Sequence, residues 1–290
     1  MIDTTMTANA ARPVRFGLNL PFANSVTEIV DNARRASDVG FDVVLLGDHL
    51  GHQAPLAPLV AIADAVPSVR VGNLVLNAPL YAPALLVRDL ATVDAATGGR
   101  LEIGLGSGYV ESDFVGFGLP FPSANRRVEL LGEHPRTMRT FLSSPDYAPA
   151  PAQTPPPILV AGIGDKMMSL AAEHADIIAI AAQGHKDQIG ERIDFIKTLA
   201  GSRFDQIELA FSFFQVSFDR TPDLTLLRGT SPTSTDEQLL QSVTLLHGSI
   251  SQAAERIAGL REEFGISYFT LNLSREVTWT EFEKLLAVAR

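Results

Sequence analysis

An aspartate–histidine pair is the first group of residues in the sequence that could do chemistry. Asp48 and His49 directly follow an apolar run at residues 42–47. An imidazole titrates near neutral pH, so His49 could act as a general acid or donate a hydrogen bond to a cofactor. The alternative is a loop histidine that bonds only to backbone. The other histidines lack the HExxH spacing of a helical zinc site, and the chain contains no cysteine, so we expect no metal site built from histidine or cysteine. A metal held by carboxylates is the alternative left open, but no clustered acidic motif points to one, so we assign no metal ligands.

Two glycine-containing segments could bring backbone close to a ligand. Residues 161–164 (AGIG) join an apolar run to a predicted helix start, where free N–H groups and the helix dipole favour a phosphate. Gly104, Gly106 and Gly108 end another apolar run, where they either make packing room or let the backbone approach a flat ring. Neither segment has a GxGxxG or Walker pattern. Because glycine often only turns the chain, each segment alone is weak evidence for a site.

The apolar runs next to these groups are typical of buried β-strands. The predicted strands cover residues 15–20, 42–47, 70–76, 100–105, 158–161, 177–181, 207–218 and 267–273. Helical patterns lie at residues 57–66, 82–97, 165–175, 186–199 and 252–264. Two more helices are predicted after Ser25 and Thr278, each of which has a glutamate three positions on, as in a capping box. Further polar residues stand at or beyond strand ends: Asn19, Asn77, Ser107, Gln183 and Asn272.

This alternation predicts a parallel (β/α)₈ barrel, because parallel strands need crossovers and the crossover helices then cover the outer face. An open doubly wound sheet is the alternative that the same pattern permits. Eight repeats within one domain length favour the closed barrel. The intervals 106–157 and 219–248 are too long for simple crossovers, so they predict insertions after strands four and seven. In such a barrel the carboxyl ends of the strands build the active site.

The composition limits the classes of function. The chain has 290 residues, 33 of them acidic and 23 basic, and its net charge of −10 argues against broad nucleic-acid binding. No apolar run reaches the roughly 18 residues that a membrane-spanning helix needs, and the first residues lack the pattern of a secretory signal. We therefore expect a cytoplasmic enzyme with a flexible tail at residues 1–13 and a single domain at residues 14–290.

Several strings occur in an order that resembles a known family. They are Phe16-Gly17-Leu18, Gly40-Phe41-Asp42 with Gly47-Asp48-His49, Val71-Gly72-Asn73-Leu74-Val75, Gly98-Gly99-Arg100-Leu101 with Gly104-Leu105-Gly106-Ser107-Gly108, and Ile158-Leu159-Val160-Ala161-Gly162 with His174-Ala175-Asp176. With residues 248–269, these strings resemble the bacterial-luciferase-like flavin/deazaflavin oxidoreductases, and more narrowly the actinobacterial branch that uses coenzyme F420. The resemblance covers nearly all of residues 15–269.

The resemblance implies a redox ring lying over the carboxyl-end mouth of the barrel, with His49 near its reactive edge. A bulge at Leu76-Asn77-Ala78, which in the family often contains a non-prolyl cis peptide, would support the ring. Strand ends and resemblance together give these expected cofactor contacts: Asn19, Asp48, Asn77, Ala78, Gly106, Ser107, Gly108, Ala161, Gly162, Ile163 and Gly164.

The expected catalytic residues are His49, Tyr109 and Glu111. Several family members place a carboxylate just after the strand-four glycines, but this chain has Tyr109 there, with Glu111 two residues on. The proton could therefore come from Tyr109 or His49. Candidate cations for the acidic cofactor are Arg126, Arg127, Lys166 and Lys186, and candidate aromatic residues above the ring are Phe114, Phe117, Phe121 and Phe213.

The function implied by the resemblance is hydride transfer between C5 of F420 and a small organic substrate. The expected partners are that substrate, an F420 or flavin reductase as electron source, and a second copy of the chain in a homodimer. One alternative is an FMN-dependent two-component monooxygenase with the same fold. A second is a barrel that binds a cofactor or ligand without catalysis.

Overall fold

Parallel strands form a closed barrel at the centre of the molecule, seen in a computed structural model that describes residues 12–290 apart from 22, 24 and 181–186. The barrel strands are β1 (Arg15–Leu20), β2 (Val43–Leu46), β3 (Arg70–Asn73), β4 (Leu76–Asn77), β5 (Leu101–Gly106), β6 (Ile158–Gly162), β7 (Ile177–Ile180), β8 (Glu208–Phe213) and β11 (Tyr268–Asn272). Their order is β3-β2-β1-β11-β8-β7-β6-β5-β4, and pairing of β3 with β5 closes the ring. Since β3 and β4 are two pieces of one barrel strand, the predicted eight-stranded (β/α)₈ barrel is confirmed and the open sheet is excluded.

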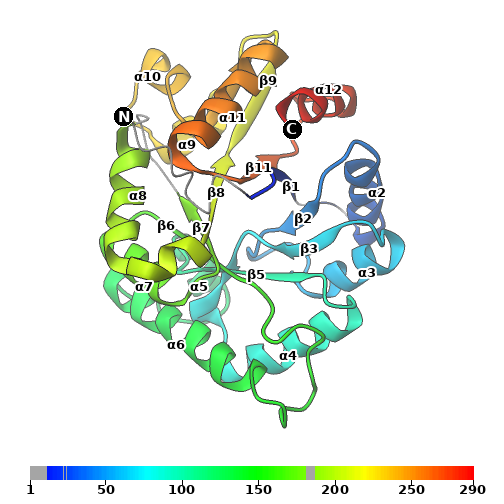
Figure 1. Ribbon diagram of the computed structural model, residues 1–290, viewed down its shortest axis with the longest axis vertical. Coiled ribbons are helices and arrows are strands. Elements are labelled where there is room, and N and C mark those ends of the chain that lie inside the picture. The colour runs from blue at the N-terminus through cyan, green and yellow to red at the C-terminus, as the bar shows by residue number, and fades with distance from the viewer. Residues whose placement is uncertain (1–11, 22, 24, 181–186) are drawn as a thin grey trace, which may run out of the picture.

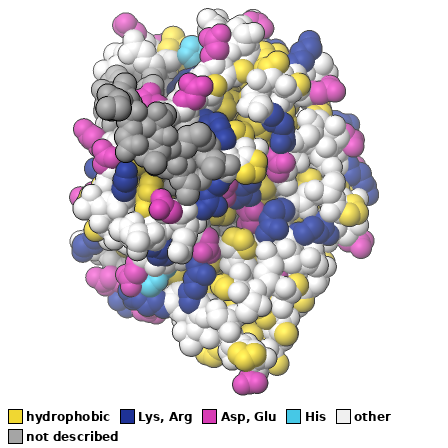
Figure 2. All heavy atoms as spheres, viewed as in Figure 1, with side chains coloured by type: hydrophobic (Ala, Val, Ile, Leu, Met, Phe, Trp, Pro, Cys, Tyr) yellow, Lys and Arg dark blue, Asp and Glu magenta, His cyan; other side chains and the backbone are white. Residues whose placement is uncertain are grey.

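Helices cover the outside of this barrel. They are α2 (Val26–Asp38), α3 (Ala57–Ala65), α4 (Pro83–Ala96), α6 (Ala124–Leu142), α7 (Asp165–His174), α8 (Asp187–Ala200), α11 (Ile250–Phe264) and α12 (Trp279–Ala289). In Figure 1, α2 and α3 lie to the right of the strands, α4 and α6 below them, and α7 and α8 to the left. Acidic and basic side chains are interspersed across the face shown in Figure 2.

Local sequence signals start and end these helices. The Ser25 hydroxyl accepts the Glu28 N–H at the start of α2, and Thr278 and Glu281 form a full capping box before α12. Gly265 ends α11 with φ 70°, a left-handed conformation that glycine adopts without a Cβ clash. One face of each of these helices is apolar and packs on the barrel, as Ile29 and Ala33 do in α2.

The third barrel strand is divided, although the sequence predicted one strand at residues 70–76. β3 pairs with β2 and β5, whereas β4 pairs with β5 alone. The peptide that joins Leu74 to Val75 between them is cis. The expected non-prolyl cis peptide therefore exists, but its predicted place at Leu76-Asn77-Ala78 is wrong. Ala78 instead begins the short 3₁₀ helix η1 (Ala78–Leu80) and is buried.

Glycines in β5 make room for this interruption. A Cβ on Gly104 would lie 1.8 Å from the carbonyl oxygen of Asn73, and one on Gly106 would lie 2.4 Å from Val75 Cγ2. No side chain fits at those separations, because carbon atoms make contact near 3.5–4.0 Å. The glycines that end β5 thus serve the packing that the sequence had offered as one of two explanations.

The seventh barrel strand also divides, although one strand was predicted at residues 207–218. β8 stays between β7 and β11, while β9 (Gln215–Phe218) leaves the barrel and pairs in parallel with β10 (Leu245–Gly248). Phe214 lies at the break: its N–H donates to Thr244 O at 2.9 Å and its carbonyl accepts from the Asn272 amide at 2.9 Å. These two hydrogen bonds take the place of the backbone hydrogen bonds that would otherwise pair this residue with a neighbouring barrel strand. The insertion also contains α9 (Thr225–Thr230) and α10 (Asp236–Leu240), and the other insertion contains α5 (Glu111–Gly116) before α6.

Charged side chains close the amino-terminal end of the barrel. One oxygen of the buried Glu102 carboxylate accepts hydrogen bonds from Arg15 at 2.5 Å and from Arg70 at 2.8 Å. Arg15 also binds both oxygens of Glu208, and its guanidinium lies 3.7 Å from the centre of the Tyr268 ring. Burial lowers the pKa of Arg15, but the facing carboxylates outweigh burial and raise it. The guanidinium therefore stays charged.

We predict that Gly104→Ala destabilises the protein by roughly 3 kcal/mol, because its new methyl group meets backbone that cannot move aside easily. The matched control is Gly259→Ala in α11, where nothing lies within 4 Å of the added Cβ. That variant should gain about 0.5–1 kcal/mol from helix propensity. Urea unfolding measures both, and equal stability of the two variants would contradict the packing explanation.

Candidate active site

Asp48 ties two strand ends together at the carboxyl end of the barrel. Its Oδ2 accepts hydrogen bonds from the Asn77 N–H and from the Tyr81 hydroxyl, both at 2.9 Å. Burial raises the pKa of Asp48, and these two hydrogen bonds oppose the rise. Asp48 thereby holds the segment after β4 against the segment after β2. Among the expected cofactor contacts, Asp48 and Asn77 are brought into direct contact.

His49 bonds to a carboxylate that the sequence prediction missed. Its Nδ1 lies 2.7 Å from Oδ2 of Asp113, which is in α5. The Asp113 side chain is 8% exposed and that of His49 is 33% exposed. The available signal was an aspartate in the first turn of a short segment after the strand-four glycines. Its burial and its direction toward His49 depend on how α5 folds back over the barrel, which no local pattern shows.

The two other expected catalytic residues are both exposed. The Tyr109 ring is edge-on to the His49 ring with centroids 6.3 Å apart, and Tyr109 is 77% exposed. Glu111 is exposed at the first position of α5. The carboxylate that contacts His49 is therefore Asp113, two residues beyond Glu111.

The end of β5 lies directly beside Asn77. Asn77 is paired in register with Gly106, and Ser107 and Gly108 follow. Gly108 has φ 67°, and a Cβ there would lie 2.2 Å from Asn77 Oδ1. The Gly108 carbonyl accepts a hydrogen bond from Arg127 at 2.9 Å, so one expected cation instead holds this loop. Asn77 Oδ1 is buried and has no hydrogen-bond partner within the described parts of the chain.

The glycine turn at residues 161–164 begins within the last two residues of β6, the strand next to β5. Gly164 is the N-cap of α7 and provides no side-chain cap. A Cβ on Gly162 would meet the Met167 side chain at 2.1 Å, whereas Ile163 is exposed. Asn19 lies elsewhere on the rim, where its amide donates to Asn272 Oδ1 at 3.1 Å.

Several other expected site residues do not line the mouth as free groups. Phe114 and Phe213 are fully buried, and Arg126 pairs with Glu129. Gln183 and Lys186 lie outside the described residues. Within the described residues, no group of three potential ligands could hold a metal ion. In the same part of the chain, no helix is long and apolar enough to cross a membrane.

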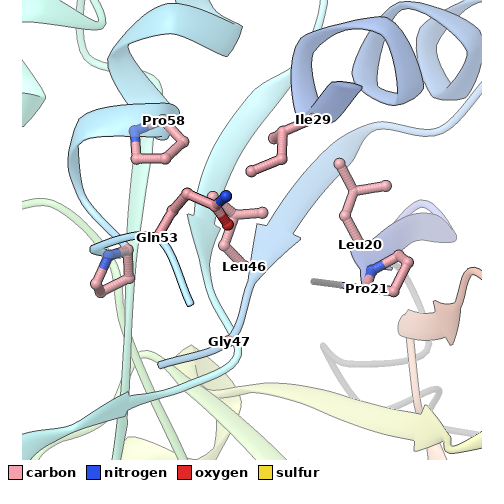
Figure 3. A pocket seen from close by; sticks show the side chains of 8 residues that line it. Leu20, Pro21, Ile29, Leu46, Gly47, Gln53 and Pro58 are labelled. Atoms are coloured by element: carbon pink, nitrogen blue, oxygen red, sulfur yellow. The ribbon is translucent and has the colours of Figure 1, made fainter. Parts of the chain in front are cut away.

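A small pocket lies between the ends of β1 and β2 and the helices α2 and α3. Figure 3 shows Leu46, Gln53 and Ile29 around the same space. Gln53 closes one side by donating to the carbonyl of Ala23 at 2.8 Å. The pocket has room of about 20 Å³, enough for about one water molecule. It cannot hold a cofactor ring, so it is not the predicted binding site.

Fold and site together define a (β/α)₈ enzyme with a histidine–carboxylate pair at the mouth of its barrel. The chain belongs to the luciferase-like monooxygenase family, whose model matches residues 6–226. This confirms both the resemblance and the expectation of an oxidoreductase.

This chain matches two curated relatives over only part of their lengths. Protein y4vJ of Sinorhizobium fredii is 26% identical over 210 residues, which are 66% of this chain and 60% of that protein. The F420-dependent glucose-6-phosphate dehydrogenase of Amycolatopsis mediterranei is 31% identical over 126 residues, which are 40% of this chain and 38% of that protein. The chain thus spans less than two thirds of either relative.

Solved structures share the whole fold at low identity. An F420-dependent secondary alcohol dehydrogenase in complex with an F420-acetone adduct has a TM-score of 0.76 at 19% identity, covering 96% of this chain and 100% of that one. The oxygenating constituent of 3,6-diketocamphane monooxygenase from Pseudomonas putida, in complex with FMN, has a TM-score of 0.76 at 15% identity, covering 96% and 98%.

We predict that Asp48→Ala costs roughly 2–4 kcal/mol of stability, because it leaves the Asn77 N–H and the Tyr81 hydroxyl buried without their acceptor. Tyr81→Phe removes only one of these bonds and should cost about 1 kcal/mol. Chemical denaturation of both variants checks this order. A Tyr81→Phe cost equal to or above that of Asp48→Ala would contradict the role given to Asp48.

We also predict that Tyr81 weakens the fold at alkaline pH. Burial and the neighbouring Asp48 raise the pKa of Tyr81 in the folded protein. In the unfolded chain, the pKa of a tyrosine is about 10. Above that pH the unfolded state binds fewer protons, so the free energy of unfolding falls as pH rises. Between pH 9 and 11, Tyr81→Phe should lose less stability than the unmodified protein. Tyr109→Phe, at an exposed tyrosine, is the control and should not reduce the loss.

Proposed function

We propose that this protein is a coenzyme F420-dependent oxidoreductase acting on a small organic substrate at the barrel mouth. The observation that carries the proposal is the His49–Asp113 pair beside the glycine-lined end of β5, in a chain of the luciferase-like family. The names of F420-dependent relatives support this choice of cofactor.

The residues at the mouth fit a flat, polar-edged cofactor. Asn77 Oδ1 is buried and lacks a partner among the described residues, and an amide oxygen in that state is costly unless a ligand or water donates to it. Asn77, Ser107 and Gly108 would hold the ring and its linker. The start of α7, where Gly164 leaves backbone N–H groups without a side-chain cap, would hold the phosphate.

The bound deazaflavin would supply hydride transfer at C5. The chain's own residues would supply orientation and a proton. His49 would hold or accept that proton on its imidazole, which remains one-third exposed at the mouth. Asp48 would keep Asn77 in place through its backbone N–H. Tyr109 and Glu111 are exposed, and they would be contacts for substrate rather than the main proton donor.

A second candidate function is an FMN-dependent two-component monooxygenase, which the FMN-containing structure of the same fold favours. A barrel that binds its cofactor without catalysis is the third. For the F420 enzyme we further propose a cytoplasmic homodimer supplied with electrons by a separate F420 reductase. For the FMN enzyme the partner would be a flavin reductase.

Cofactor titration tests the proposal directly. We predict micromolar or tighter binding of F420, followed by its absorbance, and no comparable binding of FMN. The opposite preference would favour the monooxygenase. Binding without turnover of a broad panel of alcohols, sugar phosphates and unsaturated carbonyl compounds would favour the non-catalytic barrel.

His49→Ala should retain F420 binding and lose about 10²–10⁴-fold in turnover, the usual contribution of a general acid or base. The control is His52→Ala, at an exposed histidine three residues on. It should change turnover less than about threefold, below the contribution expected of a general acid or base. Unchanged turnover in His49→Ala would remove His49 from the mechanism.

A further inference from the structure

We propose that Asp113 is the positioning residue of His49, holding its imidazole in the tautomer that carries the proton on Nδ1. The inference rests on the proposed function only in assigning proton exchange to His49. An ionised carboxylate offers acceptors alone, so the hydrogen between Asp113 Oδ2 and His49 Nδ1 belongs to Nδ1. In the neutral ring, Nε2 is then the nitrogen that accepts a proton.

The geometry of the contact is that of a strong hydrogen bond. The separation of 2.7 Å is at the short end for a nitrogen donor and a charged oxygen. Water competes little for the carboxylate, because the Asp113 side chain is nearly buried. The imidazole is more exposed, so the carboxylate is enclosed by protein while the ring remains accessible.

Contacts that do not involve His49 hold the helix that carries Asp113, α5, in place. The Asp113 carbonyl accepts from the Phe117 N–H at 3.1 Å. Its neighbour Phe114 is buried and packs edge-on against Phe121, with ring centroids 5.2 Å apart. Leu50 lies directly over Gly116, where a Cβ would be 2.0 Å from Leu50 Cδ2. Asp113 is therefore in position before any cofactor or substrate binds.

The other titratable groups around the pair have different roles. Asp48 interacts electrostatically with both His49 and Asp113, but its carboxylate already accepts from Asn77 and Tyr81. His52 is exposed and lies within electrostatic reach of the pair, and burial and then His49 lower its pKa. Tyr109 meets the His49 ring with its edge. Asp113 bonds to a ring nitrogen of His49 at 2.7 Å.

The first test needs neither cofactor nor turnover. Protein labelled with ¹⁵N-histidine is studied by two-bond ¹H–¹⁵N correlation near pH 8, and His49→Gln assigns the His49 signal. We expect the Nδ1–H tautomer in the unmodified protein. In Asp113→Asn the amide can donate to Nδ1, so the signal should move toward the Nε2–H tautomer. Asp113→Glu, which keeps the charge, should retain Nδ1–H.

Glu129→Gln is the matched control, since Glu129 is an exposed carboxylate on α6 that pairs with Arg126. It should leave the His49 signal unchanged. An Nε2–H tautomer in the unmodified protein, or an unchanged tautomer in Asp113→Asn, would overturn the proposal. If Asp113→Asn fails to fold, the signal of the unmodified protein and that of Asp113→Glu still decide it.

The second test uses the F420-loaded protein. Asp113→Asn should lower kcat by roughly 10²–10⁴-fold, as expected when a general base is held in the wrong tautomer. Its Kd for F420 should change less than about threefold, since the contact orients His49 rather than the cofactor. A parallel loss of F420 affinity and thermal stability would instead mark a structural role. If F420 is not bound at all, the proposed function fails while the tautomer experiment still judges Asp113.

Discussion

The candidate site depends on a steric constraint inside the barrel wall. β5 has no side chain at Gly104 or Gly106, where the third barrel strand bulges toward it. That space lets the strand break and resume as β4, which places the Asn77 N–H on Asp48. A side chain at either position would clash with Asn73 or Val75, where the strand is divided. Gly104 and Gly106 thus shape the site by leaving room for the divided strand, in addition to any contact with a ligand.

The two ends of the barrel carry different kinds of polar group. At the amino end, Arg15 and Arg70 both donate hydrogen bonds to Glu102. Removing one partner from this buried set would leave an uncompensated charge, so these residues stabilise the fold. At the carboxyl end, Asn77 keeps a buried oxygen without a partner among the described residues, and His49 stays partly exposed. Charges that pair with one another at the amino end, and a partly exposed histidine at the carboxyl end, agree with the usual location of barrel active sites.

The sequence was sufficient for the barrel but not for its breaks. Parallel strands buried on both faces appear as continuous apolar runs, so each barrel strand could be found from its composition. The same property hid the divisions at Leu74-Val75 and Phe214, because the apolar character continues across both. The place of His49 and Asn77 at the carboxyl end of the barrel could be predicted, since the sequence puts them at or just beyond strand ends. Asp113 could not, because its contact with His49 spans 64 positions and depends on the packing of α5.

The insertion after the seventh barrel strand, which contains the small sheet of β9 and β10, has a small apolar cluster of its own. Leu227, Leu239 and Leu245 form a separate apolar cluster there, outside the main core. In Figure 1 this part projects above the strands with α9 and α10. The sheet itself packs on the main core through Val216, Phe218 and Leu246, so α9 and α10 are the part that can be lengthened, trimmed or exchanged over evolutionary time without repacking the cylinder. The fold therefore offers a modular place for diversification that leaves the shared chemistry undisturbed.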